Sequence, residues 1–245
     1  MGGLVLSLFD LTGNFVKPWA EAGFKTLCVD TQHRIRAPLP GTLNVDLSTI
    51  GPLLVALQQR GYGPKDIAFL ACWPVCTDVA VSGARDFRTK GLRRLAASVE
   101  QFATCQELAE LVECPYMIEN PVSAMATHWR KPDHYFHPHH FAGFEPADNY
   151  TKLTCIWSGN GFVMPEAFPL LDAAEPDDRI HNPPRVGSRE FSVGNPDGVC
   201  PCRLPRECVA RERRSMSSAP RFFNSPQPPA KATVKLVTPD DVEPC

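Results

Sequence analysis

The feature that most constrains the fold of this chain is a series of short apolar runs, each ending at a turn or a polar residue. The runs span residues 4–9, 24–29, 67–72 and 114–118. Their length and continuous apolar character are typical of strands buried on both faces of a sheet. Amphipathic helical patterns separate them, most clearly over residues 90–112. This alternation predicts an α/β fold built on a doubly wound, mostly parallel sheet.

Turn residues and weaker patterns predict the remaining elements. We expect a first helix through Trp19 that Gly23 closes, because glycine commonly ends helices. We also expect a short strand over residues 44–47, a helix over 50–60 and a late strand over 150–157.

Proline content divides the chain into two parts. Of the 25 prolines, 14 lie in residues 1–181 and 11 in the remaining 64 residues. A stretch rich in proline and poor in periodic apolar positions forms little core. We therefore expect one α/β domain over residues 1–185 and an irregular or disordered tail over 186–245.

Charge and cysteine content exclude several classes of protein. The formal net charge of −2 does not suit a polybasic protein that holds nucleic acid by charge alone, although a local basic groove remains open. No apolar run approaches the roughly 20 residues that cross a bilayer. The 10 cysteines are irregularly spaced, and the first residues do not resemble a secretion signal. We expect a cytoplasmic protein with no membrane partner.

Cys76 is the first candidate for chemistry. It lies in the turn Trp73-Pro74-Val75-Cys76, directly after the apolar run 67–72. In an open parallel sheet, ligands bind beyond the carboxyl ends of the strands. Glu119 ends another run, so the thiol and the carboxylate are expected to share one edge. The alternative is that Cys76 is a packed cysteine, since free cysteine is commonly buried.

The first strand, turn, helix and second strand have the layout of a nucleoside-binding unit. Gly13 lies in the turn and Asp30 ends the second strand, where a carboxylate can accept ribose hydroxyl protons. Asp46 follows in the third strand and either faces an adenine amine or caps the next helix. A plain structural turn at Gly13 is the alternative to a ligand-binding one.

Taken in order, these motifs resemble the DNA cytosine-5 methyltransferases, especially the short versions carried by bacteriophages. The resemblance covers roughly residues 3–182 and rests on Pro74-Val75-Cys76 with the residues to Arg85, on Glu119-Asn120-Pro121, and on Thr151 to Trp157. It implies a Rossmann-like methyltransferase fold, S-adenosylmethionine as cofactor, double-stranded DNA as partner and a bacterial host cell. Its departures are a glycine-rich turn reduced to Gly13, Val75 in place of a second proline, and Pro121 in place of valine.

The resemblance assigns a role to each matched residue. Phe9, Gly13, Asp30, Asp46 and Pro74 would hold the cofactor. Cys76 would be the nucleophile, because carbon 5 of cytosine becomes reactive only after a thiolate adds to carbon 6. Glu119 would stabilise the charge that develops at ring nitrogen 3, with Asn120 positioning it. Lys152 would contact the flipped nucleotide in place of the family's arginines.

Several alternatives stay open at this stage. The chain could be a catalytically weak or inactive relative that binds DNA as a decoy, or an enzyme that methylates RNA cytosine. His134, His137, His139 and His140 with Cys155 could bind zinc, but their spacing fits no standard zinc site, and we expect no metal. The oligomeric state and the target sequence are not predicted.

Overall fold

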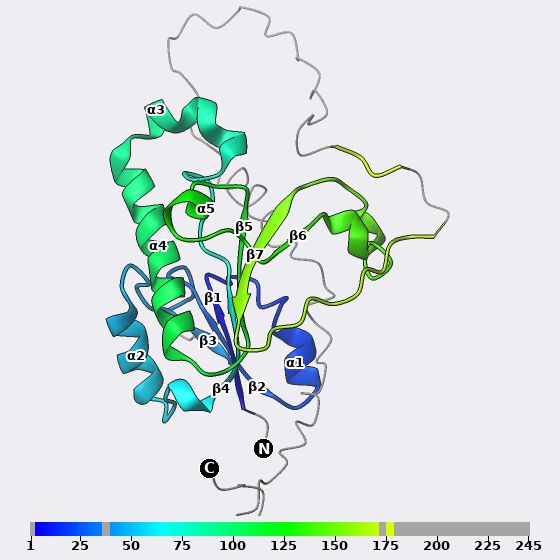
Figure 1. Cartoon of the computed structure of the whole chain (residues 1–245). Helices are drawn as coiled ribbons and strands as arrows, with labels where there is room; N and C mark the ends of the chain where they lie inside the picture. The colour runs from blue at the N-terminus through cyan, green and yellow to red at the C-terminus, as the bar shows by residue number, and fades with distance from the viewer. Residues whose placement is uncertain (1–2, 36–39, 172–174, 179–245) are drawn as a thin grey trace, which may run out of the picture.

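A single seven-stranded sheet with helices on both faces forms the framework of the chain (Figure 1). This computed structural model describes residues 3–35, 40–171 and 175–178. The strands are β1 (Leu4–Leu8), β2 (Lys25–Val29), β3 (Thr42–Leu43), β4 (Ile67–Cys72), β5 (Tyr116–Pro121), β6 (His134–Phe136) and β7 (Thr154–Gly159). The helices are α1 (Lys17–Glu21), α2 (Ile50–Gln58), α3 (Phe87–Lys90), α4 (Leu92–Leu111) and α5 (Met125–His128). Short 3-10 turns are η1 (Pro64–Asp66), η2 (Val81–Asp86), η3 (Pro138–Phe141) and η4 (Pro146–Asp148).

The strand order is β3-β2-β1-β4-β5-β7-β6. Neighbours from β3 to β5 are parallel, whereas β7 runs antiparallel to both β5 and β6. The chain therefore builds the sheet outward in one direction from β1 to β3 and in the other from β4 onward. The predicted α/β architecture with a mostly parallel sheet is confirmed. The reversal lies between β1 and β4, the position at which open α/β sheets bind ligands.

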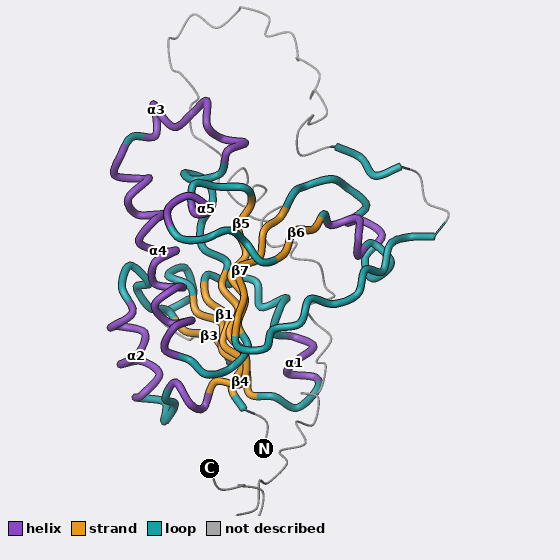
Figure 2. Tube along the Cα trace, viewed as in Figure 1, coloured by secondary structure: helices purple, strands orange, loops and turns teal. Residues whose placement is uncertain are grey.

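Both faces of the sheet are covered, which explains why its strands read as continuous apolar runs. All five residues of β1 are buried. Leu4, Leu6 and Leu8 belong to the core under α2 and α4, whereas Val5 joins the core that contains Trp19 of α1. Figure 2 shows α1 on one side of the strands and α2 with α4 on the other. Successive residues of β1 thus point to the two cores in turn, because side chains alternate between the faces of a strand.

Three expected boundaries differ from the structure, each for a tertiary reason. The third strand lies at Thr42–Leu43 instead of residues 44–47, because the Asn44 side chain donates hydrogen bonds to the carbonyls of Thr31 and His33. β5 continues past Ile118 to Pro121, because antiparallel β7 pairs with it along that length. The late strand accordingly begins at Thr154.

The tail expected at residues 186–245, like the boundary at 185, lies outside the described residues. Within those that are described, none of the helices combines the length and apolar character needed to cross a membrane.

Leu70 provides a direct test of the packing. Its side chain is fully buried at the centre of β4, so Leu70→Ala should lower the free energy of unfolding by about 2 to 5 kcal/mol. Leu92→Ala is the matched control, because Leu92 is 81% exposed on α4 and should change stability by less than about 0.5 kcal/mol. Urea titrations of both variants measure the difference, and equal stabilities would contradict this core.

Candidate functional site

The carboxyl ends of β1, β2, β4 and β5 meet at one edge of the sheet. Leu8 is in register with both Val29 and Cys72, and Cys72 is in register with Ile118. The residues that follow these positions therefore leave the sheet side by side. Figure 1 shows α3 and α5 beyond the same edge.

Cys76 occupies a compact turn in the loop after β4. Its carbonyl accepts hydrogen bonds from the N–H groups of Val79 and Ala80 at 3.0 and 2.9 Å. Asn120 of β5 donates from Nδ2 to the carbonyl of Pro74 at 3.2 Å, while its Oδ1 is buried without a hydrogen-bond partner in the described part of the chain. Asn120, which was predicted to position Glu119, is thus seen to tie the cysteine loop to β5.

A buried carboxylate two residues beyond Cys76 anchors the same loop. Asp78 contacts Lys90 at 3.7 Å and Arg94 at 3.3 Å, and it accepts a hydrogen bond from Ser98 Oγ at 3.5 Å. Lys90 also donates to the carbonyl of Thr77 at 2.6 Å. The loop is therefore held against α3 and α4. Asp78 was not predicted from the sequence. An acid two residues after the cysteine, with two cations four residues apart on the predicted helix, could have indicated it.

Cys76, Glu119 and Lys152 lie close enough to shift one another's protonation. Burial, followed by the charge of Glu119, raises the pKa of Cys76 to about 11 against the lowering influence of Lys152. Burial also raises the pKa of Glu119, with Lys152 opposing it. For Lys152, burial lowers the pKa, but Glu119 and then Cys76 outweigh it, so that pKa is raised. The structure thus brings together three residues from three separate segments.

These directions define the chemical state of the cluster. A thiol with a pKa near 11 is protonated and unreactive at neutral pH. A carboxyl group whose pKa is raised holds its proton more readily and can then donate it. The ammonium group of Lys152 stays charged and favours the thiolate. A potential nucleophile, a potential acid and a cation therefore lie within electrostatic reach of one another.

Lys152 reaches this cluster from the segment that leads into β7. Its N–H donates to Nδ1 of His137 at 3.1 Å, and its carbonyl accepts a hydrogen bond from the Thr154 hydroxyl at 3.2 Å. β7 pairs with β5, with Thr154 opposite Pro121. The antiparallel strand is thus what carries Lys152 next to Glu119.

The turn after β1 is organised by Asp10, to which sequence analysis gave no role. Its carboxylate accepts hydrogen bonds from the N–H groups of Thr12 and Gly13 at 3.1 and 2.8 Å and from the Ser7 hydroxyl at 2.9 Å. The Ser7 oxygen in turn accepts from Trp73 Nε1 at 3.1 Å. An Asp followed by Gly three residues later was the available signal, because such carboxylates bond to the backbone of their own turn.

Two residues of this turn have left-handed backbones. Gly13 has φ 68°, which favours glycine at this position, and Phe9 has φ 58°, which is uncommon for a bulky residue. Phe9 is half-buried, and its N–H donates to the carbonyl of Val29 at 2.7 Å. A strained backbone at the carboxyl edge is typical of ligand sites.

The two expected acids differ in environment. Asp30 is buried at the end of β2, and its Oδ1 accepts from the N–H and the side-chain amide of Gln32 at 2.8 and 3.2 Å. Asp46 is exposed and accepts from the N–H of Ser48 at 2.9 Å. Thr49 is the N-cap residue of α2, so the expectation that Asp46 caps this helix is wrong.

The contribution of Asp10 to stability can be tested by substitution. Asp10→Ala leaves the buried Ser7 hydroxyl and Cys28 thiol, and the partly buried N–H groups of its turn, without this acceptor. It should lower the free energy of unfolding by about 1 to 3 kcal/mol. Asp66→Ala is the control, because Asp66 accepts only an exposed turn N–H of Gly63 in the described structure and should lose at most about 1 kcal/mol. Urea titration measures both, and equal losses would remove the special role of Asp10.

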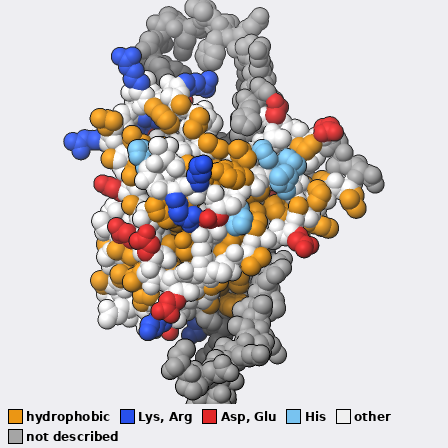
Figure 3. All heavy atoms as spheres, viewed as in Figure 1, with side chains coloured by type: hydrophobic (Ala, Val, Ile, Leu, Met, Phe, Trp, Pro, Cys, Tyr) orange, Lys and Arg blue, Asp and Glu red, His pale blue; other side chains and the backbone are white. Residues whose placement is uncertain are grey.

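The histidine-rich segment brings three rings together, one pair stacked and two pairs edge to face. Figure 3 shows histidines gathered on one side of the molecule, where Figure 1 shows the unlabelled helical turns that follow β6. The ring centroids of His139 and His140 are 4.5 Å apart, and those of His137 and His139 are 5.3 Å apart. In the described ranges, no three His, Cys, Asp or Glu side chains are arranged to hold a metal ion.

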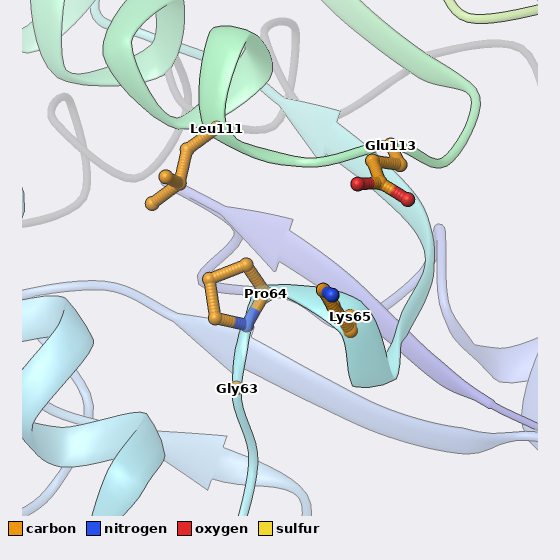
Figure 4. A pocket seen from close by; sticks show the side chains of 5 residues that line it. All are labelled: Gly63, Pro64, Lys65, Leu111 and Glu113. Carbon is orange, nitrogen blue, oxygen red and sulfur yellow. The ribbon is translucent and has the colours of Figure 1, made fainter.

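A separate hollow lies at the opposite edge of the sheet, between η1 and the end of α4. It has a volume of about 410 Å³ and is lined by Gly63, Pro64, Lys65, Leu111 and Glu113 (Figure 4). It lies where β4 begins, whereas Cys76 follows the end of that strand. The hollow therefore takes no part in the cysteine site.

No protein-family model matches the chain, and no curated protein matches it.

Proposed function

We propose that this chain is an S-adenosylmethionine-dependent DNA cytosine-5 methyltransferase, of the kind by which phages modify their DNA against restriction. The observation that carries the proposal is the meeting of Cys76, Glu119 and Lys152 at one edge of the sheet. Each has the chemistry that addition to a cytosine ring requires.

The fold supports the proposal at the level of topology. The strand order reverses between β1 and β4, and open α/β sheets commonly bind nucleotides at such a point. The turn that contains Phe9 and Gly13, both with positive φ, lies beside it. A Rossmann-like methyltransferase fold accounts for these features. Phe9, Gly13, Asp30, Asp46 and Pro74 would hold the cofactor, which supplies an electrophilic methyl group. The close glycine turn and the buried acid at the end of β2 fit such a ligand.

The proposed reaction uses these three groups in turn. The Cys76 thiol loses its proton to water, and the Lys152 ammonium stabilises the thiolate. The thiolate sulfur bonds to carbon 6, while protonated Glu119 donates to nitrogen 3 and stabilises the developing negative charge. Carbon 5 then takes the methyl group from the bound cofactor, which leaves as a neutral thioether, and nitrogen 3 returns its proton to Glu119. A base, such as water, removes the carbon 5 proton, and the C–S electron pair returns to sulfur as the thiolate leaves.

The target base must leave the duplex to reach these groups, at a cost of a few kcal/mol. A basic segment beside the Cys76 loop offers contacts to the DNA backbone. Arg85, Arg88, Lys90, Arg93 and Arg94 all fall in η2, α3 and the start of α4. Figure 3 shows cationic side chains gathered around the end of the molecule where Figure 1 places α3. Local charge of this kind compensates for an overall charge of −2.

The salt dependence of binding tests this segment. Replacing both Arg88 and Arg93, which are exposed, with glutamine should reduce the slope of log affinity against log salt by about 2, because each phosphate contact releases counterions. Lys65→Gln, at the opposite edge, is the control and should leave the slope unchanged. Fluorescence anisotropy with a labelled duplex gives both slopes. Equal slopes would show that DNA binds elsewhere.

Methyl transfer itself is tested with labelled S-adenosylmethionine and duplex DNA of mixed sequence, followed by digestion to nucleosides. We expect label in 5-methylcytosine. Structured RNA added as a competitor separates DNA from RNA as the substrate. Absence of label from cytosine in both nucleic acids would overturn the proposal.

The second candidate is a catalytically weak or inactive relative that binds DNA as a decoy. The observation that favours it is the turn after β1, in which Asp10 occupies the N–H groups of Thr12 and Gly13. Calorimetry distinguishes the candidates, because an active pocket should bind S-adenosylmethionine at micromolar concentrations. DNA binding without cofactor binding would favour the decoy.

A further inference from the structure

His137 connects the three histidine rings to the proposed catalytic cluster. It lies between β6 and η3, and its Nδ1 accepts the N–H of Lys152 at 3.1 Å. An imidazole nitrogen accepts a hydrogen bond only when it carries no proton. The observed contact therefore requires neutral His137 with its proton on Nε2.

The neighbouring rings add to this requirement. The centroid of His137 lies 5.3 Å from that of His139 and 5.6 Å from that of His140, and the N–H of His137 donates to Nδ1 of His140 at 3.4 Å. Burial lowers the pKa of His140, and the charges of its neighbours His139 and His137 lower it further. Because like charges repel, a charge on one of three rings this close disfavours a charge on the others.

Other titratable groups lie on the elements packed around this segment. Burial lowers the pKa of Lys152, whereas Glu119, Cys76 and, least of the three, Tyr150 raise it. The Tyr150 carbonyl also accepts a hydrogen bond from the N–H of His139. The groups to be considered with His137 are His134 of β6, His139 and His140 of η3, Asp148 of η4, Tyr150, Lys152, Asp177, and Glu119 with Cys76 beyond Lys152.

We propose that His137 is a positioning residue that holds Lys152 beside Cys76 only while its imidazole is neutral, so that acid uncouples the lysine from the thiol. Protonation would turn Nδ1 into a donor that faces the N–H donor of Lys152. It would also place a positive charge against the backbone N–H of Lys152. Both effects displace the Lys152 segment and remove the influence that lowers the pKa of Cys76. The inference deepens the proposed function and rests on its assignment of Lys152.

Alkylation of Cys76 reports on this coupling without requiring methyl transfer. Iodoacetamide reacts with the thiolate, so the log rate should rise with a slope of about one per pH unit far below the thiol pKa. In the wild-type chain, the slope should exceed one over the pH range in which His137 gains its proton, and should return to about one above it. Peptide mass spectrometry isolates the modification at Cys76 from that at other cysteines.

Two substitutions at His137 separate positioning from general support of the fold. In His137→Asn, Oδ1 takes the place of Nδ1 and accepts at every pH, so the slope should stay at about one and the rate at pH 8 should match the wild type within about twofold. In His137→Leu, the acceptor is lost, and the rate at pH 8 should fall on the order of three- to tenfold. Rescue by asparagine supports positioning by the acceptor atom.

Each outcome decides the inference. A slope of one throughout in the wild type, or asparagine that behaves like leucine, would overturn it. Methyl transfer is measured on the same samples. Methylation with no steep region in alkylation refutes the role of His137 and leaves the proposed function standing, whereas a steep region without methylation supports the coupling and refutes the proposed function.

Discussion

Cys76→Ala is expected to reduce methyl transfer at least about 1,000-fold, because carbon 5 of cytosine is not activated unless sulfur adds to carbon 6. The loop should survive the change, since Asn120 holds it at Pro74 and Asp78 holds it to α3 and α4. DNA and cofactor binding should therefore persist while turnover is lost. Transfer of labelled methyl groups under single-turnover conditions measures the effect.

Cys114→Ala is the matched control for this substitution. Cys114 precedes β5 at the opposite edge of the sheet, and burial also raises its pKa to about 11. It should retain wild-type turnover. A duplex carrying 5-fluorocytosine adds a direct readout, because the fluorine at carbon 5 cannot leave as a proton. The wild type and Cys114→Ala should form a covalent complex that survives denaturing electrophoresis, whereas full activity in Cys76→Ala would refute the mechanism.

Glu119→Gln should change two properties of the site in opposite directions. At a pH below 9 that is high enough to ionise Glu119 in the free protein, glutamine removes the negative charge that, after burial, raises the pKa of Cys76. Alkylation of Cys76 should then accelerate on the order of three- to tenfold. Methyl transfer should fall by about 100- to 10,000-fold, because glutamine cannot donate a full proton to nitrogen 3. A more reactive thiol would then accompany a less active enzyme.

Glu113→Gln provides the control for that experiment. Glu113 is exposed and lines the hollow at the opposite edge of the sheet, so neither alkylation nor methyl transfer should change. A general loss of structure in Glu119→Gln would slow methyl transfer and expose several cysteines to alkylation, which peptide mapping detects. Slower alkylation confined to Cys76 would show that Glu119 does not raise the pKa of the thiol.

The strands and the location of the site edge follow from local sequence patterns. Residues 67–72 form β4 within the predicted bounds, and the helix predicted over 90–112 corresponds to α4, with Gly91 at φ 78° separating it from α3. Because parallel strands point the same way, a residue after β4 and one late in β5 were expected at one edge. The structure places Cys76 and Glu119 accordingly.

The approach of Lys152 to this edge could not be predicted in the same way. Its position depends on antiparallel β7 pairing with β5 and on the acceptor that His137 provides. The sequence shows an acid near the cysteine and two cations on the predicted helix, but only the fold pairs Asp78 with Lys90 and Arg94. Only the fold also links Asp10 through Ser7 to Trp73.

The sequence by itself determined the apolar periodicity, the turns and therefore the α/β class, because burial of alternate or successive residues is a property of each segment alone. It also placed Cys76 and Glu119 at strand ends. Only the tertiary structure decided which charges and hydrogen-bond partners meet, from Lys152 beside Glu119 to His137 behind Lys152. Such contacts join segments that are remote in the chain, and pKa values respond to distance and burial in three dimensions.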